Sequence, residues 1–227
     1  PVDSYDFFDA ILRPGDSFDS DFSDEYDHGL TLKEVNPMLI YDQSSPKSSY
    51  SLKRRLDIPE DSMLAYVQLG AGRINDMDNL LSMTLKILSN YPHCYVIMAE
   101  SLIGERLDMG QERMRLLRDY PNSQWFGEID FSIIAGGYNS YHEMVEFCVP
   151  SLIIPNLNTG RDDQVKRIQA SAKTGATVML KKPNKVTLEA AIDRIMDPEV
   201  RKLMSRKMDR LRKPNGAKEA ADWIINQ

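Results

Sequence analysis

The chain has 227 residues, of which 42% are hydrophobic and 27% are charged, a composition typical of a folded globular protein. Its formal net charge of −6 argues against broad electrostatic binding to nucleic acid or to anionic lipid. No apolar run approaches the roughly 18 residues that cross a bilayer, and the first residues lack the basic-then-apolar order of a signal peptide.

Because the chain begins at Pro1 rather than Met, we expect it to be a piece of a longer protein. Cys94 and Cys148 lie in apolar runs, which predicts two buried, free thiols in a reducing compartment. No Cys or His spacing indicates a metal site. The expected location is the cytoplasm, with contact to the cytoplasmic face of a membrane as an alternative if the rest of the protein provides it.

The region before residue 51 shows little regular pattern. Residues 16–28 carry six carboxylates in thirteen positions. An Asp-x-Asp-x-Ser order within them resembles a calcium loop, but Asp24 and Leu30 stand where such a loop needs glycine and glutamate, so a solvated acidic loop is favoured. Residues 41–51 are rich in serine and indicate a linker. Residues 7–12, "FFDAIL", predict one additional strand.

From about residue 63, short apolar runs alternate with segments of helical spacing. The runs predict strands at 63–69, 94–99, 131–135, 151–155 and 176–180. The spacing predicts helices at 77–90, 108–120, 139–147, 161–174, 187–196, 198–212 and 217–226. Gly175 is expected to end the helix that precedes it.

Strands that are apolar throughout and that alternate with helices are typical of a parallel sheet covered on both faces. We therefore predict an α/β fold with a doubly wound, mostly parallel, Rossmann-like sheet. This domain is expected to span residues 51–227. Residues 1–50 are interpreted as an acidic and linker region that includes the tail of a truncated N-terminal domain.

The predicted strand at 63–69 is followed by Gly70, Ala71, Gly72 and Arg73. The glycines allow close approach of a ligand to the backbone, and Arg73 can bind phosphate. A GxGxxG dinucleotide pattern is incomplete here because its third glycine is missing. A turn that is rich in glycine only for packing remains an alternative.

A second loop follows the strand at 131–135 and contains Gly136, Gly137, Asn139 and Ser140. A helix that starts there offers free backbone N–H groups and a partial positive charge, which together bind phosphate. Glu143 could close a capping box with Ser140, or it could accept the hydroxyl groups of a pentose. The spacing leaves both interpretations open.

A third polar turn leads into the helix that begins near Asp163 and Gln164. Acidic groups suit a helix start as caps, but Asp and Gln together can also bind neighbouring hydroxyl groups. Ligands of open α/β sheets bind beyond the carboxyl ends of the strands, where the strand order reverses. Three polar turns of this kind predict a site for a nucleotide sugar.

Residues 136–168, "GGYNSYHEMVEFCVPSLIIPNLNTGRDDQVKRI", resemble the donor-binding C-terminal half of GT-B glycosyltransferases. They are similar to family 28, which includes the bacterial peptidoglycan N-acetylglucosaminyltransferase, and to plant UDP-sugar transferases. The resemblance implies that Asn139 and Ser140 contact the donor phosphates and that Glu143 holds the ribose hydroxyls. It also implies that Asp163 and Gln164 contact the transferred sugar. The glycine-rich loop of Gly70, Ala71 and Gly72, with Arg73 beside it, would lie near the diphosphate. One departure is that the histidine of the plant motif falls on Ala135, while His142 is interpreted as a packing residue.

The resemblance further implies an inverting, metal-independent hexosyltransferase whose donor is a nucleoside diphosphate sugar, most often a UDP-sugar, with no other cofactor. A role in bacterial polysaccharide biosynthesis would fit this class. In GT-B enzymes the general base and the acceptor site lie on the N-terminal domain, so no catalytic residue is assigned. The chain alone is expected to bind donor but to transfer little, with an acceptor sugar, lipid or small molecule bound by the missing domain.

Two alternatives remain open. One is a nucleotide-sugar 2-epimerase or hydrolase of the same fold. The other is a non-catalytic nucleotide-sugar-binding subunit, on which Trp223 of the last predicted helix would contact a partner chain.

Overall fold

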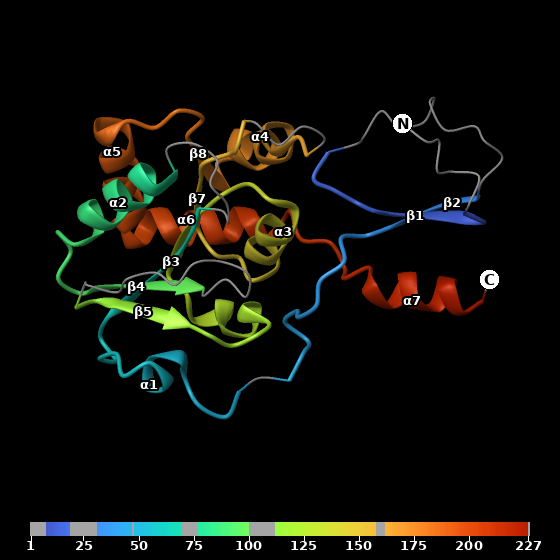
Figure 1. Cartoon of the computed structure of the whole chain (residues 1–227), viewed down its shortest axis with the longest axis horizontal. Helices are drawn as coiled ribbons and strands as arrows, with labels where there is room; N and C mark the ends of the chain where they lie inside the picture. The colour runs from blue at the N-terminus through green and yellow to red at the C-terminus, as the bar shows by residue number, and fades with distance from the viewer. Residues whose placement is uncertain are drawn as a thin grey trace.

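The larger body of the protein is built on a six-stranded sheet, in a computed structural model that describes residues 8–18, 31–46, 48–69, 77–99, 112–157 and 162–226 (Figure 1). The strands are β3 (Met63–Gln68), β4 (Cys94–Ala99), β5 (Met114–Leu117), β6 (Phe131–Ile134), β7 (Ser151–Ile153) and β8 (Thr177–Met179). Their order is β5-β4-β3-β6-β7-β8, and each neighbouring pair is parallel. The predicted doubly wound parallel sheet is confirmed.

Helices cover both faces of this sheet. They are α1 (Leu52–Arg55), α2 (Met77–Leu88), the 3-10 helix η2 (Asn122–Glu128), α3 (Tyr138–Glu146), α4 (Gln164–Thr174), α5 (Lys185–Met196) and α6 (Pro198–Asp209). Along β3, Ala65 and Val67 pack in one core with α2 and α5, while Leu64 and Tyr66 pack in the other with η2, α3 and α4. This alternation explains why the strand is apolar at every buried position. None of the helices in the described ranges is long and apolar enough to span a membrane.

The helix predicted at 108–120 is wrong for its second half, because residues 114–117 form the edge strand β5. Met114 packs in one core and Leu117 in the other, so the two side chains point to opposite faces of the sheet. Pairing with β4 satisfies the backbone of this short segment. Residues 101–111 lie outside the described residues.

One local prediction is confirmed and another holds in part. Gly175 ends α4 in the left-handed conformation, with φ of 74°, where glycine carries no steric penalty. Cys94 and Cys148 are both free, and Cys94 is buried, which raises the pKa of its thiol to about 12. Cys148 is only partly buried, so the prediction of two buried thiols is wrong for it.

A separate two-stranded parallel sheet precedes the large body and consists of β1 (Ala10–Pro14) and β2 (Thr31–Val35). The C-terminal helix α7 (Ala217–Ile225) lies beside it, away from the six-stranded sheet (Figure 1). The sequence predicted the first strand from residues 7–12, but β2 was missed within the region interpreted as acidic and linker. We call β1, β2 and α7 the β1–β2 unit.

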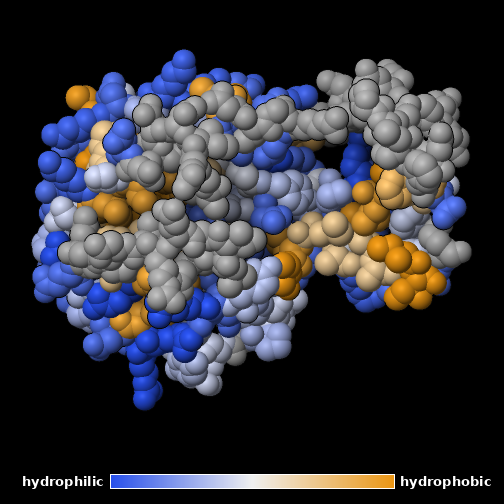
Figure 2. All heavy atoms as spheres, viewed as in Figure 1, coloured by the Kyte–Doolittle hydropathy of each residue, from blue (hydrophilic) through white to orange (hydrophobic). Residues whose placement is uncertain are grey.

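Apolar side chains remain exposed on the β1–β2 unit at Leu32, Ile224 and Ile225, and also at Phe8 just before β1. Figure 2 shows apolar surface gathered over this end of the molecule. A two-stranded parallel sheet is unusual by itself, since parallel strands are normally buried inside larger sheets.

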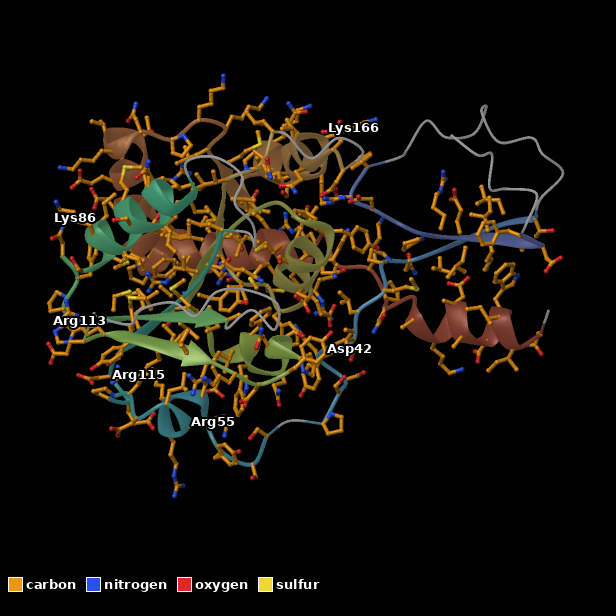
Figure 3. The ribbon with its side chains drawn as sticks, in the orientation of Figure 1. Asp42, Arg55, Lys86, Arg113, Arg115 and Lys166 are labelled. Atoms are coloured by element: carbon orange, nitrogen blue, oxygen red, sulfur yellow. The ribbon has the colours of Figure 1, made fainter. Side chains whose placement is uncertain are left out.

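Two chain segments connect the β1–β2 unit to the large body, at residues 36–46 and 210–216, and they are tied to each other. Asn215 Oδ1 accepts the Leu39 N–H at 3.0 Å, and its Nδ2 donates to the Leu39 carbonyl at 3.0 Å and to Asp42 Oδ2 at 2.8 Å. Asp42 is labelled between the two parts in Figure 3. The two connections therefore form one hydrogen-bonded junction.

Gly216 brings the two connecting segments into backbone contact, which gives a test of this junction. A Cβ at Gly216 would lie 2.2 Å from the Asn36 carbonyl oxygen, too close to fit without moving the backbone. We expect Gly216→Ala to lower the free energy of unfolding by roughly 1–3 kcal/mol in urea denaturation, the usual cost of overpacking. Gly127→Ala is the control, since a Cβ there meets its nearest neighbour at 4.0 Å. Equal stabilities of the two variants would contradict the packing described.

Candidate functional site

The strand order reverses between β3 and β6, which makes this pair the switch point of the sheet. From β3 the chain moves outward through β4 and β5, and from β6 it moves in the opposite direction through β7 and β8. The two strands pair in parallel from Ala65 with Phe131 to Gln68 with Ile134, so both end at the same edge. Ligands of open α/β sheets bind at this place. Of the two loops predicted here, Gly70, Ala71, Gly72 and Arg73 lie outside the described residues.

The second loop leads directly into α3, whose N-terminus is open. Gly137 is the N-cap, and no described side chain caps the helix. The Tyr141 N–H is bonded to the Gly137 carbonyl at 3.0 Å, so the N–H groups of the three preceding residues have no helical partner. Asn139 is exposed and Ser140 is half-buried in this first turn.

The capping-box interpretation of Ser140 and Glu143 is wrong. The helix begins at Tyr138, one residue before the predicted start, and Ser140 is its third residue rather than its N-cap. Glu143 lies a further turn into the helix, where it cannot reach the N-cap. Ser140 Oγ instead donates to Gln68 Oε1 at 3.2 Å, which links the first turn of α3 to the end of β3.

The two glycines of the loop have different structural roles. A Cβ at Gly136 would lie 2.4 Å from Ile168 Cδ1 and 3.2 Å from Gln164 Cβ, so Gly136 is required for the packing of this turn on α4. A Cβ at Gly137 would meet no described atom within 4 Å. Gly137 therefore borders open space within the described part of the chain, and its backbone is accessible to a ligand.

Glu143 is the acidic group of this site and is partly buried. Burial raises the pKa of its carboxyl, and nearby Ser123 lowers it in part. Burial, with the Glu143 charge as a second cause, raises the pKa of the buried Tyr66 hydroxyl as well. A carboxylate with a perturbed pKa beside an open helix end is a functional-site candidate.

Residues of η2 complete this polar cluster, and sequence reasoning missed them. Within the described residues, Asn122 Oδ1 and Ser123 Oγ are buried side-chain atoms without a hydrogen bond of good geometry. Buried polar atoms of this kind need an explanation, since nearly all such atoms in folded proteins are bonded. The Pro-Asn-Ser order at 121–123 signals a turn, but nothing in it points to Glu143.

In the third predicted turn, the side chains of Asp163 and Gln164 form hydrogen bonds within the protein itself. Asp163 is the N-cap of α4, where its Oδ1 accepts the Lys166 N–H at 2.8 Å, so the capping interpretation is confirmed. Gln164 is buried; its Oε1 accepts the Asn156 N–H at 2.9 Å, and its Nε2 donates to Asp162 Oδ2 at 3.1 Å. Gln164 thus fixes the turn between β7 and α4, and Asp163 is the exposed member of the pair.

Arg167 of α4 forms an ion pair with Asp16 and also contacts the turn that precedes α3. The sequence did not predict this pair. The Arg167 guanidinium is buried and bonds the Asp16 carboxylate through Nε at 3.0 Å and through Nη2 at 2.8 Å. The interpretation of residues 16–28 as a solvated loop is wrong for Asp16, which is partly buried. Burial alone would raise the pKa of Asp16, but hydrogen bonds from His142, Arg167 and Ser17 hold it well below its usual range.

His142 is buried, as the packing interpretation expected, and it also belongs to the same polar network. It is buried on α3, with Nε2 3.3 Å from Asp16 Oδ1. Burial lowers the pKa of the imidazole, although the Asp16 charge acts in the opposite direction.

Comparisons with known proteins identify the class of this fold. No protein-family model and no curated protein sequence matches the chain. Among solved structures, the glycotransferase of kitacinnamycin matches with a TM-score of 0.65 at 18% identity, over 99% of this chain and 57% of that one. The spinosyn rhamnosyltransferase SpnG complexed with thymidine diphosphate matches with a TM-score of 0.54 at 13% identity, over 84% of this chain and 56% of that one.

MurG of Acinetobacter baumannii also matches, with a TM-score of 0.56 at 14% identity, over 86% of this chain and 60% of that one. The chain has the fold of the GT-B glycosyltransferases, which confirms the resemblance seen in the sequence. Because SpnG and MurG both match, the likeness does not single out family 28. The chain spans a little over half the length of these structures.

The raised pKa of Glu143 predicts a stability effect. A group whose pKa is higher in the folded protein contributes stability below its unfolded pKa and loses that contribution as the pH rises through the folded value. At pH 7 the buried charge of Glu143 should therefore destabilise the fold. We expect Glu143→Gln to melt at a higher temperature than the unmodified chain at pH 7, with the gain shrinking toward about pH 4, where the carboxyl is protonated. A lower melting temperature at pH 7 would show that the carboxylate stabilises the fold.

Proposed function

We propose that this chain is the donor-binding half of an inverting glycosyltransferase and that it binds the diphosphate of a nucleoside diphosphate sugar at the N-terminus of α3. The observation that carries the proposal is the uncapped start of α3 beside open space at Gly137, at the switch point of the sheet. Free N–H groups and the helix dipole favour a negatively charged phosphate there. Asn139 and Ser140 lie in the same turn and can add side-chain hydrogen bonds.

The nucleoside would extend from the diphosphate along α3 toward Glu143. The carboxylate of Glu143 can accept two pentose hydroxyl groups, and their bonds would offset the cost of its burial. Asn122 and Ser123 of η2 offer further polar groups beside it. A uridine nucleotide is the first candidate, and the thymidine diphosphate in the SpnG complex makes thymidine the second.

The transferred sugar would lie on the other side of the diphosphate, toward α4. Asp163, at the exposed N-cap, is the group that can accept sugar hydroxyls, while Gln164 fixes the turn that carries it. Gly70, Ala71, Gly72 and Arg73 lie outside the described residues, but they come shortly after the end of β3 in the sequence. We propose that they also contact the diphosphate.

In the proposed reaction, the bond between the anomeric carbon and the diphosphate oxygen breaks while an acceptor oxygen bonds to the opposite face of that carbon. The acceptor proton passes to a base that we place outside this chain, in the part of the GT-B fold that it does not cover. The helix N–H groups and Arg73 would stabilise the negative charge that develops on the leaving diphosphate, so the proposal requires no metal ion.

A panel of nucleotides tests the proposed function. Isothermal titration calorimetry with UDP, TDP, ADP and GDP should show one preferred diphosphate. Gly137→Val should abolish this binding while the chain still folds, since a Cβ there meets no described atom within 4 Å and the valine loses only the N-cap preference of glycine. Gly136→Ala is the matched comparison and should lower the melting temperature, because its Cβ meets Ile168. Unchanged nucleotide binding by Gly137→Val would refute the placement of the diphosphate.

Glu143→Ala tests the pentose contact separately. The variant should bind the preferred nucleoside diphosphate more weakly by roughly 1–3 kcal/mol, the cost of losing hydrogen bonds to a charged group. Binding of inorganic diphosphate should not change, because that ligand has no pentose. Equal losses for both ligands in calorimetry would place Glu143 at the phosphates instead.

A further inference from the structure

Arg167 lies between the proposed diphosphate turn and the segment that follows β1. It is 4% exposed. Its Nε and Nη2 bond Asp16, and its Nη1 donates to the Gly136 carbonyl at 2.8 Å and pairs with Asp162 Oδ1 at 2.7 Å. All three nitrogens of the guanidinium are therefore used inside the chain. Arg167 is not a free cation for a ligand, and its effect has to act through the groups that it holds.

The bond to the Gly136 carbonyl controls the direction of a backbone N–H. The Gly136 carbonyl and the Gly137 N–H belong to one planar trans peptide, so they point in opposite directions. Because the carbonyl points to the guanidinium on the α4 side, the Gly137 N–H points the other way. Gly137 is also the N-cap from which α3 begins, so this peptide sets the position of the whole first turn.

The segment after β1 holds this arrangement from several sides. Tyr138, the first residue of α3, donates from its hydroxyl to the Gly15 carbonyl at 2.8 Å, and the Arg167 guanidinium carbon lies 5.4 Å from its ring centroid. Ser17 Oγ donates to the Arg167 carbonyl at 2.8 Å. Lys166, labelled on α4 in Figure 3, has its Nζ 4.9 Å from the ring centroid of Phe18. Residues 15–18 therefore contact both α3 and α4 where the two helices begin.

We propose that Arg167 is a positioning residue for the diphosphate turn and that Asp16, from the segment after β1, holds it in its working orientation. The proposal rests on the proposed function, since it assigns the turn to a diphosphate. The turn is then formed only when the segment after β1 is docked against α3 and α4. Binding of the nucleotide and docking of the β1–β2 unit are thereby coupled, and each should favour the other.

Arg167→Lys tests this proposal, because lysine keeps the charge but cannot bond Asp16 and the Gly136 carbonyl with one planar group. The matched control is Glu146→Gln, at the other end of α3. Glu146 is also buried, and its Oε1 accepts the Gln43 N–H at 3.1 Å, so it ties a connecting segment to the same helix without touching the turn. Asp16→Asn is a second variant, which keeps the shape of the pair but removes its negative charge.

Calorimetry with UDP and TDP, and with uridine and thymidine, distinguishes a defect in the diphosphate turn from a general loss of the binding site. Arg167→Lys should weaken the preferred diphosphate by about tenfold or more, the effect of losing a well-aligned bond to a charged ligand. The matching nucleoside should bind within about twofold of its original affinity, and Glu146→Gln should change neither. Asp16→Asn should show the same selective loss to a smaller extent. Full diphosphate affinity in Arg167→Lys, or an equal loss in Glu146→Gln, would overturn the proposal.

Hydrogen exchange gives a second measurement that needs no nucleotide. The Tyr141 amide, bonded to the Gly137 carbonyl, should exchange faster in Arg167→Lys than in the unmodified chain and in Glu146→Gln. Unchanged exchange in Arg167→Lys would show that the turn does not depend on Arg167. If the unmodified chain binds no nucleotide at all, the proposed function fails, and exchange alone then decides whether Arg167 holds the turn.

Discussion

The parallel pairing of β3 with β6 is the constraint on which the site depends. It places the ends of two strands from opposite halves of the sheet at one edge, and it directs the chain into α3 beside that edge. Gly136 allows the turn to pack on α4, and Gly137 leaves its backbone accessible. Among the described residues, the positive end of α3 then meets no capping side chain, and helix ends of this kind favour a phosphate.

Some groups at the site do not stabilise the fold. Burial disfavours the charge of Glu143, and the polar atoms of Asn122 and Ser123 lack good partners among the described residues. Each feature costs folding free energy, and all three residues lie at one place. The buried Arg167–Asp16 pair is different, because its two charged groups bond each other. Arg167 also bonds the Gly136 carbonyl of the turn.

The sequence predicted what depends on local pattern. The apolar runs gave five of the six strands of the large sheet, and Gly175 marked a helix end because its backbone is left-handed there. The glycines at 136–137 marked the start of α3. The strand β5 was missed because its four residues fit a helical spacing equally well. Arg167 and Asp16 are 151 residues apart, and the cluster of Tyr66, Ser123 and Glu143 joins three separate elements. Such contacts arise from tertiary packing, which one sequence does not encode as a visible pattern.

The central claim is that the first turn of α3 binds a diphosphate through its backbone. A nuclear magnetic resonance titration of the ¹⁵N-labelled chain with the preferred nucleoside diphosphate observes this directly. The account predicts that the amide resonances of Gly137, Tyr138, Asn139 and Ser140 shift most strongly and in proportion to binding. Saturation of the protein with nucleotide while these four resonances stay in place would contradict it.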